Sequence, residues 1–242
     1  MSISPYSKRT IIKKEIPSQP LQQTRSIRVF LPPGYNELVT YPVVYCQDGE
    51  QFFNFGRIAT HATRLILDEG MEPVMIVGVD ADLPRRTDEY SPSGRLFDDY
   101  CQFFVSELVP FIENEFPVRS SKEERILAGD SLGGTVSLHL ALDRPDLFCK
   151  VISLSGAFME STQERLREET DLSELDIYML IGQDETEVET DRGVFNFLQM
   201  NRTARKMLEE RGARVRYVEK PGKHLWGFWQ NELPEALLYF LA

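Results

Sequence analysis

RILAGDSLGG, residues 125–134, determines the architecture that we expect for this chain of 242 residues. An apolar run from Ile126 to Ala128 leads to Ser131, which stands between Gly129 and Gly133. A second apolar segment, residues 135–142, follows at once and is long enough for a buried helix. A strand, a sharp turn and a helix in this order form the context of a Gly-x-Ser-x-Gly nucleophile elbow. The pattern therefore predicts Ser131 as a nucleophile.

The residues around Ser131 fit the geometry of such a turn. Glycines on both sides have no Cβ that would collide with the adjoining strand and helix, and the serine itself takes a strained backbone conformation. Ser131 then precedes the first turn of the helix, where the amide of Leu132 faces a developing oxyanion. The alternative interpretation is a Gly/Ser loop that caps a helix. The apolar strand and the apolar helix favour the nucleophile.

Length and charge restrict the class of protein. The composition, 42% hydrophobic and 27% charged, is that of a globular protein, and the length suits one α/β domain over residues 1–242. The formal net charge of −11 argues against nucleic acid and anionic membrane as partners, because both repel an acidic surface. No apolar run approaches the length of a membrane span.

Cysteine usage and the first residues indicate the compartment. Cys46, Cys101 and Cys149 are an odd number, lie far apart and each have apolar neighbours, so we expect buried free thiols. Residues 1–16 have no apolar core of signal-peptide length. Together these features predict a cytoplasmic protein.

The remaining segments alternate between strand and helix patterns. Residues 1–10 are expected to be a frayed or edge segment. The predicted strands are 10–16, 22–31, 41–46, 73–79, the apolar run 126–128, 150–155, 176–182 and 215–219, and the predicted helices are 56–69, 97–116, 135–144, 157–175, 194–211 and a closing helix within 224–241. Such alternation implies an α/β fold with a mostly parallel central sheet of about eight strands and helices on both faces. The polar segment 157–175 leaves room for only a minimal lid.

A serine nucleophile needs a base, and the chain has three histidines. In this fold the order along the chain is serine, acid, histidine, so His61 precedes the nucleophile and is excluded. His139 lies eight residues along the elbow helix, about 12 Å from its start at 1.5 Å per residue. His224 remains, in a loop after the last predicted strand. A surface or helix-capping histidine is the alternative interpretation of this residue.

The acid and the second oxyanion donor are expected in two other loops. Five carboxylates lie between Asp184 and Asp191, and most of them belong to a solvated loop. A calcium site is an alternative, but no recognisable calcium-loop pattern is present. The first turn after the strand narrows the acid to Asp184 or Glu185. The amide of Glu50, after Gly49, is the candidate for the second donor, with its side chain facing solvent.

The chain resembles the putative esterase branch of the α/β-hydrolases, which includes esterase D and S-formylglutathione hydrolases, feruloyl esterases, enterochelin-type siderophore esterases and mycolyl transferases. The matching segments are LPPGY (31–35), YP (41–42) with DG (48–49), RTDEYSP (86–92), LVPFI (108–112), the elbow, PDLF (145–148), SLSG (153–156) and HLW (224–226) with Trp229. The resemblance implies that Ser131 and His224 are catalytic and that the amides of Leu132 and Glu50 form the oxyanion hole. Its acid spacing falls on Glu185, although aspartate is more usual there, so Asp184 stays open.

Several further residues are candidates for binding substrate. Four aromatic residues are expected either to line an acyl pocket or to belong to the core: Trp226, Phe52, Phe53 and Trp229. Arg86 and Tyr90 come from the RTDEYSP segment, and Arg86 and Glu89 either pair beside the site or are two surface charges.

The sequence therefore predicts a serine carboxylic-ester hydrolase that acts on a small-molecule ester. No metal or organic cofactor is implied. Two alternatives stay open: an acyltransferase that uses the same residues, and a catalytically silent binding module with this fold.

Overall fold

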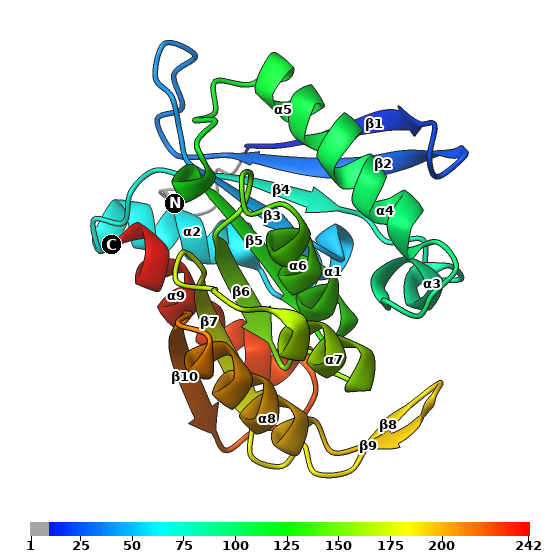
Figure 1. Cartoon of the computed structure of the whole chain (residues 1–242). Coiled ribbons are helices and arrows are strands. Elements are labelled where there is room, and N and C mark those ends of the chain that lie inside the picture. Colours follow the sequence, from blue (N-terminus) through cyan, green and yellow to red (C-terminus); the bar gives the residue numbers. More distant parts are fainter. Residues whose placement is uncertain (1–9) are drawn as a thin grey trace.

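An eight-stranded sheet forms the centre of the computed structural model, which describes residues 10–242 (Figure 1). The strand order is β1-β2-β4-β3-β5-β6-β7-β10. The strands are β1 (Thr10–Ser18), β2 (Gln23–Leu31), β3 (Val43–Cys46), β4 (Met75–Val79), β5 (Arg125–Asp130), β6 (Lys150–Leu154), β7 (Asp176–Gly182) and β10 (Arg214–Lys220). Apart from Thr10, the segment 1–10 lies outside the described residues.

Six of these strands run parallel, from β4 to β10, and β2 pairs antiparallel with both β1 and β4. The mostly parallel central sheet of eight strands is thus confirmed. The central strands β3, β4 and β5 are buried along their whole lengths. Continuous apolar runs suit such strands because helices cover both of their faces.

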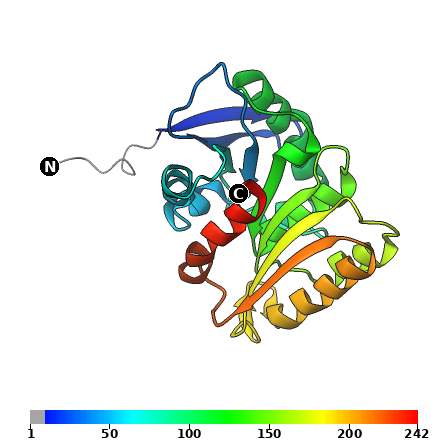
Figure 2. The same cartoon turned by 90° about the vertical axis from the view of Figure 1, so that its left-hand side faces the viewer.

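The helices divide between the two faces of the sheet, as Figure 2 shows. Apolar side chains of α2 and α9 share one core with alternate residues of the strands, for example Leu65, Leu233 and Ile76. The opposite core contains residues of α4, α5, α6 and α8. The helices are α1 (Gly49–Asn54), α2 (Ile58–Asp68), α3 (Arg86–Tyr90), α4 (Phe97–Phe103), α5 (Val109–Glu115), α6 (Leu132–Asp143), α7 (Glu160–Glu168), α8 (Phe197–Glu210) and α9 (Trp226–Leu241).

Several predicted helices differ from the structure in their boundaries; within 157–175, for example, the helix α7 spans only Glu160–Glu168. The predicted helix 97–116 contains a π-helical turn, Phe104–Leu108, between α4 and α5. Pro110 at the start of α5 has no N–H for the α-helical ladder, which favours an irregular turn there. The predicted helix 194–211 begins only at Phe197, because Asn196 caps it by accepting a hydrogen bond from the amide of Gln199 (2.8 Å).

The residues before α8 form a short hairpin that the sequence did not predict. Strand β8 (Val188–Thr190) pairs antiparallel with β9 (Gly193–Phe195), and Figure 1 shows this hairpin extending away from the main sheet. Its strands have three residues each and lie in the acidic stretch that was expected to be a solvated loop. The periodicity of so short a strand is too brief to detect.

Two further expectations concern the cysteines and the membrane. All three cysteines are free thiols; Cys46 and Cys149 are buried, whereas Cys101 is partly exposed. The described part of the chain holds no helix with the length and apolar character needed to traverse a bilayer.

Candidate active site

Ser131 occupies the sharp turn between β5 and α6. Its backbone has φ 52° and ψ −121°, a conformation that residues other than glycine rarely adopt. Its amide donates to the carbonyl oxygen of Leu154 (2.9 Å), so the turn is tied to the end of β6. A Cβ added at Gly129 would lie 2.1 Å from the carbonyl carbon of Gly133, which shows why this turn needs glycine.

His224 and Glu185 face one another in the loops that follow β10 and β7. The Nδ1 atom of His224 lies 2.6 Å from Oε2 of Glu185. Glu185 has no exposed side-chain surface, whereas 16% of the His224 side chain is exposed. The imidazole also packs between two rings, with centroids 4.4 Å from Phe197 and 4.9 Å from Trp229. The histidine is thereby held in one orientation, with its other nitrogen unencumbered by the carboxylate.

The structure separates the two acid candidates. Glu185 turns inward, and its Oε1 accepts hydrogen bonds from the amide of Gly182 (2.9 Å) and the hydroxyl of Ser155 (2.6 Å). Asp184 is exposed, and its backbone amide donates to the carbonyl oxygen of Gly222 (3.0 Å). Ser155 was not among the site residues predicted from the sequence. The only signal for it was its place in the SLSG segment, 153–156.

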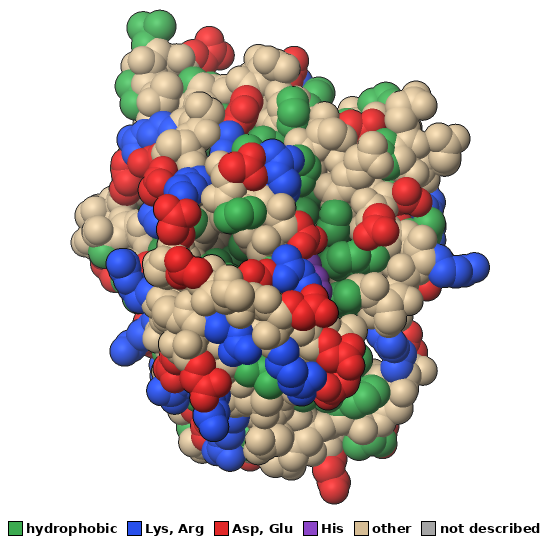
Figure 3. Space-filling view, in the orientation of Figure 1, with side chains coloured by type: hydrophobic (Ala, Val, Ile, Leu, Met, Phe, Trp, Pro, Cys, Tyr) green, Lys and Arg blue, Asp and Glu red, His purple; other side chains and the backbone are tan. Residues whose placement is uncertain are grey.

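Ser131, Leu132 and His224 line one cavity of about 300 Å³. Arg86, Ala157 and Phe197 are also among its walls. Figure 3 shows the molecule from the direction of Figure 1, with hydrophobic side chains lying between groups of positively and negatively charged side chains. The candidates for nucleophile and base, Ser131 and His224, are 93 positions apart in the sequence (224 − 131) but line the same cavity.

The β8–β9 hairpin covers this cavity from the side of α3. Asp191 accepts a hydrogen bond from Thr87 (3.1 Å), and Arg192 donates to the hydroxyls of Ser91 (2.7 Å) and Ser93 (3.1 Å). Residues 189–192 line the cavity as well. The segment after β6 is as short as predicted, and its helix α7 spans Glu160–Glu168. The unpredicted hairpin thus contributes four residues to the cavity walls, whereas the segment after β6 contributes Ala157 and Met159.

The loop before α1 reaches the site through an ion pair. Asp48 has a left-handed backbone (φ 53°), and its carboxylate receives two hydrogen bonds of 2.7 Å from Arg86. A Cβ added at Gly49 would lie 2.4 Å from the carbonyl carbon of Gly78, so glycine is needed here too. Glu50 follows in the first turn of α1, and its exposed side chain pairs with Arg28 (3.2 Å).

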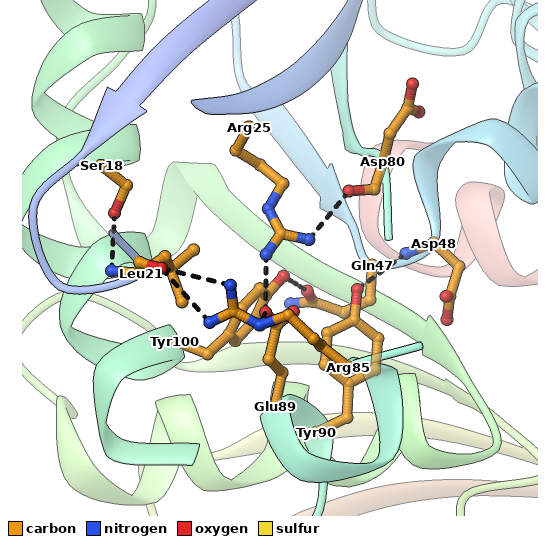
Figure 4. A network of polar contacts seen from close by, with 10 residues as sticks. All are labelled: Ser18, Leu21, Arg25, Gln47, Asp48, Asp80, Arg85, Glu89, Tyr90 and Tyr100. Carbon is orange, nitrogen blue, oxygen red and sulfur yellow. Dashed lines mark hydrogen bonds and ion pairs between the residues drawn. The ribbon is translucent and has the colours of Figure 1, made fainter. Parts of the chain in front are cut away.

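A buried polar network lies beneath this loop (Figure 4). Arg25 and Glu89 form an ion pair of 2.7 Å with almost no exposed surface, and Arg85 approaches the same carboxylate at 3.3 Å. Neither alternative for Arg86 and Glu89 is therefore correct, because the two residues do not pair with each other and Glu89 is buried, not a surface charge. These residues point in different directions from α3, so Glu89 meets the cations beneath the loop and Arg86 meets Asp48.

Three candidates for substrate binding lie outside the cavity walls. Tyr90 and Phe52 are fully buried. The hydroxyl of Tyr90 accepts a hydrogen bond from the amide of Asp48 (3.3 Å), and the ring of Phe52 packs against that of Trp226 (4.9 Å between centroids). The indole nitrogen of Trp226 donates to Gln51 (2.8 Å). These aromatic residues support the loop and the core, and of the four candidates Arg86 alone is among the cavity walls.

The two other histidines lie away from the cavity. His139 is buried in α6, with Nε2 3.0 Å from the hydroxyl of Thr162. Burial, assisted by the charge of Arg165, lowers its pKa to about 4. Burial also lowers the pKa of His61 in α2. Both histidines are therefore neutral structural residues at neutral pH. Within residues 10–242, no group of three or more His, Cys, Asp or Glu side chains is arranged to hold a metal ion.

Asp130 is a buried carboxyl group directly before Ser131. Burial and the nearby charge of Asp48 raise its pKa to about 7, against the opposing effect of Arg86. Its Oδ1 atom has no hydrogen-bond partner within residues 10–242. Because the folded pKa exceeds the unfolded value of about 3.9, folding favours the protonated form. The resulting stability is fully present below about pH 4 and is lost as the pH rises through 7.

We expect Asp130→Asn to raise the melting temperature at pH 8 by at least about 2 °C, because the amide carries no charge to bury. The difference in melting temperature between Asp130→Asn and wild type should become smaller towards pH 5. Thermal melts across this range measure it, with Asp98→Asn, on the exposed side of α4, as the control. A variant that melts below the wild type at pH 8 would show that ionised Asp130 stabilises the fold through Arg86.

Comparisons with known proteins place the chain among esterases. The model of a family described as "Putative esterase" matches residues 18–240. A Bacillus subtilis (strain 168) protein, "Uncharacterized protein YjcH", is 34% identical over 230 residues, which are 94% of this chain and 96% of that protein.

Solved structures show the same fold at lower identity. A ferulic acid esterase superposes with a TM-score of 0.82 at 20% identity, over 97% of this chain and 98% of its own. The enterobactin esterase FES from Shigella flexneri superposes with a TM-score of 0.83 at 20% identity, over 99% of this chain but only 62% of its own.

Proposed function

The chain belongs to the putative esterase family and is a carboxylic ester hydrolase, and we propose that it works through Ser131, His224 and Glu185 as a catalytic triad. The observation that carries this proposal is the 2.6 Å contact between His224 and the buried Glu185, beside a cavity that His224 shares with Ser131. An unperturbed serine hydroxyl is a weak nucleophile and needs such an oriented base.

In the proposed first step, Oγ of Ser131 attacks the ester carbonyl while Nε2 of His224 accepts its proton. Glu185 accepts the Nδ1–H of the same ring, which selects the tautomer that leaves Nε2 free and stabilises the imidazolium once it forms. The backbone of Ser131 is already in the strained elbow conformation before substrate binds. Little reorganisation is needed at the moment of attack.

The negative charge that develops on the carbonyl oxygen needs hydrogen-bond donors that are already in place. We assign this role to the backbone amides of Leu132, at the start of α6, and Glu50, in the first turn of α1. The ion pair between Asp48 and Arg86 fixes the loop that carries Glu50. Each such donor typically contributes a factor of about 10² to 10³ to kcat.

The tetrahedral intermediate then collapses, and His224 delivers its proton to the departing alkoxide. Water attacks the acyl-enzyme with His224 again acting as base, which releases the carboxylic acid and restores the Ser131 hydroxyl. Charged residues of the hairpin and α3 line the cavity, among them Arg86, Glu189 and Arg192. This mixed lining supports a small, polar, soluble ester as substrate.

A fluorophosphonate probe tests the proposal directly, because it reacts covalently with an activated serine. We expect one adduct per chain, located on Ser131 by peptide mass spectrometry, and no adduct on Ser131→Ala. With a simple ester and an added alcohol, the free acid should remain the main product. Hydrolysis by a chain that resists the probe, or labelling of another serine, would contradict this triad.

A further inference from the structure

We infer that Ser155 and Trp229 are positioning residues that hold the Glu185 carboxylate in register with His224. The inference rests on the proposed function, since it concerns the residues that orient the triad acid. It goes further by assigning a role to a hydrogen-bonded chain that runs from Trp229 through Ser155 to Glu185.

Ser155 follows β6 and has no exposed surface. Its backbone lies in the left-handed region (φ 50°), which favours glycine, and its amide donates to the carbonyl oxygen of Leu180 (2.7 Å). The strained conformation directs the hydroxyl to Oε1 of Glu185 at 2.6 Å. A serine where the backbone would favour glycine indicates that the hydroxyl has a use.

Trp229 fixes the direction of that hydrogen bond. Its indole N–H can only donate, and it lies 2.8 Å from Oγ of Ser155. The hydroxyl therefore accepts from Trp229 and donates its own proton to Glu185. The Trp229 ring also meets the His224 ring edge to face, at 4.9 Å and 85°. One buried side chain of α9 thus supports both the base and, through Ser155, the acid.

These contacts satisfy both oxygens of a glutamate. Oε1 accepts from the amide of Gly182 and from Ser155, and Oε2 faces Nδ1 of His224. Glutamate has one more rotatable bond than aspartate, so more conformational freedom must be lost to hold it. The chain from Trp229 supplies that constraint and explains how the longer acid occupies this position.

Two variants of Ser155 separate a positioning role from a merely structural one. Ser155→Ala and Ser155→Gly both delete the hydroxyl, but only glycine relieves the positive φ, so Ser155→Gly should melt at the higher temperature. We expect both variants to lose about tenfold to a hundredfold in kcat, the range for a hydrogen bond to a charged group, with KM within about threefold of wild type. Trp229→Phe keeps a ring and should lose kcat less severely.

The matched control is Ser153→Ala. Ser153 lies on β6, two residues before Ser155, and is equally buried, but its hydroxyl has no hydrogen-bond partner within residues 10–242. This variant should keep wild-type kcat. A second readout needs no substrate: the far-downfield proton NMR signal of the His224 Nδ1–H, assigned by its absence in His224→Ala, should weaken in both Ser155 variants and persist in Ser153→Ala.

The inference is overturned if kcat and the Nδ1–H signal of both Ser155 variants match those of Ser153→Ala. It is equally overturned if Ser155→Gly recovers wild-type kcat while Ser155→Ala does not, because activity would then follow backbone strain. Neither result would touch the proposed triad. Failure of the triad itself would appear as retained activity in Ser131→Ala or as absent labelling of the wild type by fluorophosphonate.

Discussion

Ser131→Ala should lower kcat for a p-nitrophenyl ester by about 10⁴-fold or more, with a nearly unchanged melting temperature. Alanine and serine meet the same backbone strain at φ 52°, so the substitution leaves the elbow as it is. It removes the only atom that forms the acyl-enzyme in the proposed mechanism. Oxyanion donors and substrate binding would account for the residual rate.

Initial rates on purified protein measure this loss, and fluorophosphonate labelling of the Ser131→Ala sample reveals any contaminating wild type. Ser137→Ala is the matched control, because Ser137 lies on α6 and its buried hydroxyl has no partner within residues 10–242. The control should stay within about twofold of wild type, as is usual for changes outside a functional contact. Retention of a tenth of wild-type turnover by Ser131→Ala would refute the mechanism.

Glu185→Gln should cost at least about 10²-fold in kcat and up to about 10⁴-fold, the loss known for the same acid-to-amide change in a serine protease triad. Glutamine preserves the shape of the side chain. Its amide group presents N–H donors near Nδ1 of His224, where only an acceptor selects the productive tautomer. The variant therefore replaces the 2.6 Å contact between Nδ1 of His224 and the Glu185 carboxylate with one in which an N–H donor can face the N–H of the ring.

Asp184→Asn provides the comparison, since Asp184 is the adjacent carboxylate but is exposed. We expect its kcat to stay within a few-fold of wild type. Steady-state kinetics and thermal melts should be recorded for both variants, because a fall in stability would complicate Glu185→Gln. If both variants work nearly as well as wild type, the enzyme operates as a Ser–His dyad or recruits an acid further along the loop.

The fold was predictable because its signals are local and repeated. Each parallel strand is a short apolar run, and alternation of such runs with helical patterns leaves few topologies. The elbow added a specific turn whose steric needs appear in the sequence as Gly129 and Gly133. Boundaries were less accurate: the hairpin of β8 and β9 and the π-helical turn depend on hydrogen bonds that leave no periodic pattern.

The aromatic and charged candidates show where reasoning from residue type failed. Phe52 and Tyr90 are buried supports, since a large aromatic residue fits a core as well as a binding pocket. Arg86 pairs with Asp48 and not with Glu89, its neighbour three positions along α3. Glu89 pairs instead with the buried Arg25, which lies 64 positions earlier in the sequence. The residues around position 89 contain no pattern that predicts a pairing over such a separation.

Chain order and local pattern were enough to nominate Ser131 and His224, because a nucleophile elbow is a contiguous motif and only one histidine follows it at a suitable place. The choice between Glu185 and Asp184 depended on the direction in which each side chain points. Consecutive residues of a turn point to different sides, and only the packed structure shows that Glu185 faces His224 while Asp184 faces solvent. Ser155, which follows β6, donates to that carboxylate and accepts from Trp229 of α9, which lies 74 positions further along the sequence. Such contacts arise from tertiary packing, which brings distant backbone segments together, and no local periodicity encodes them.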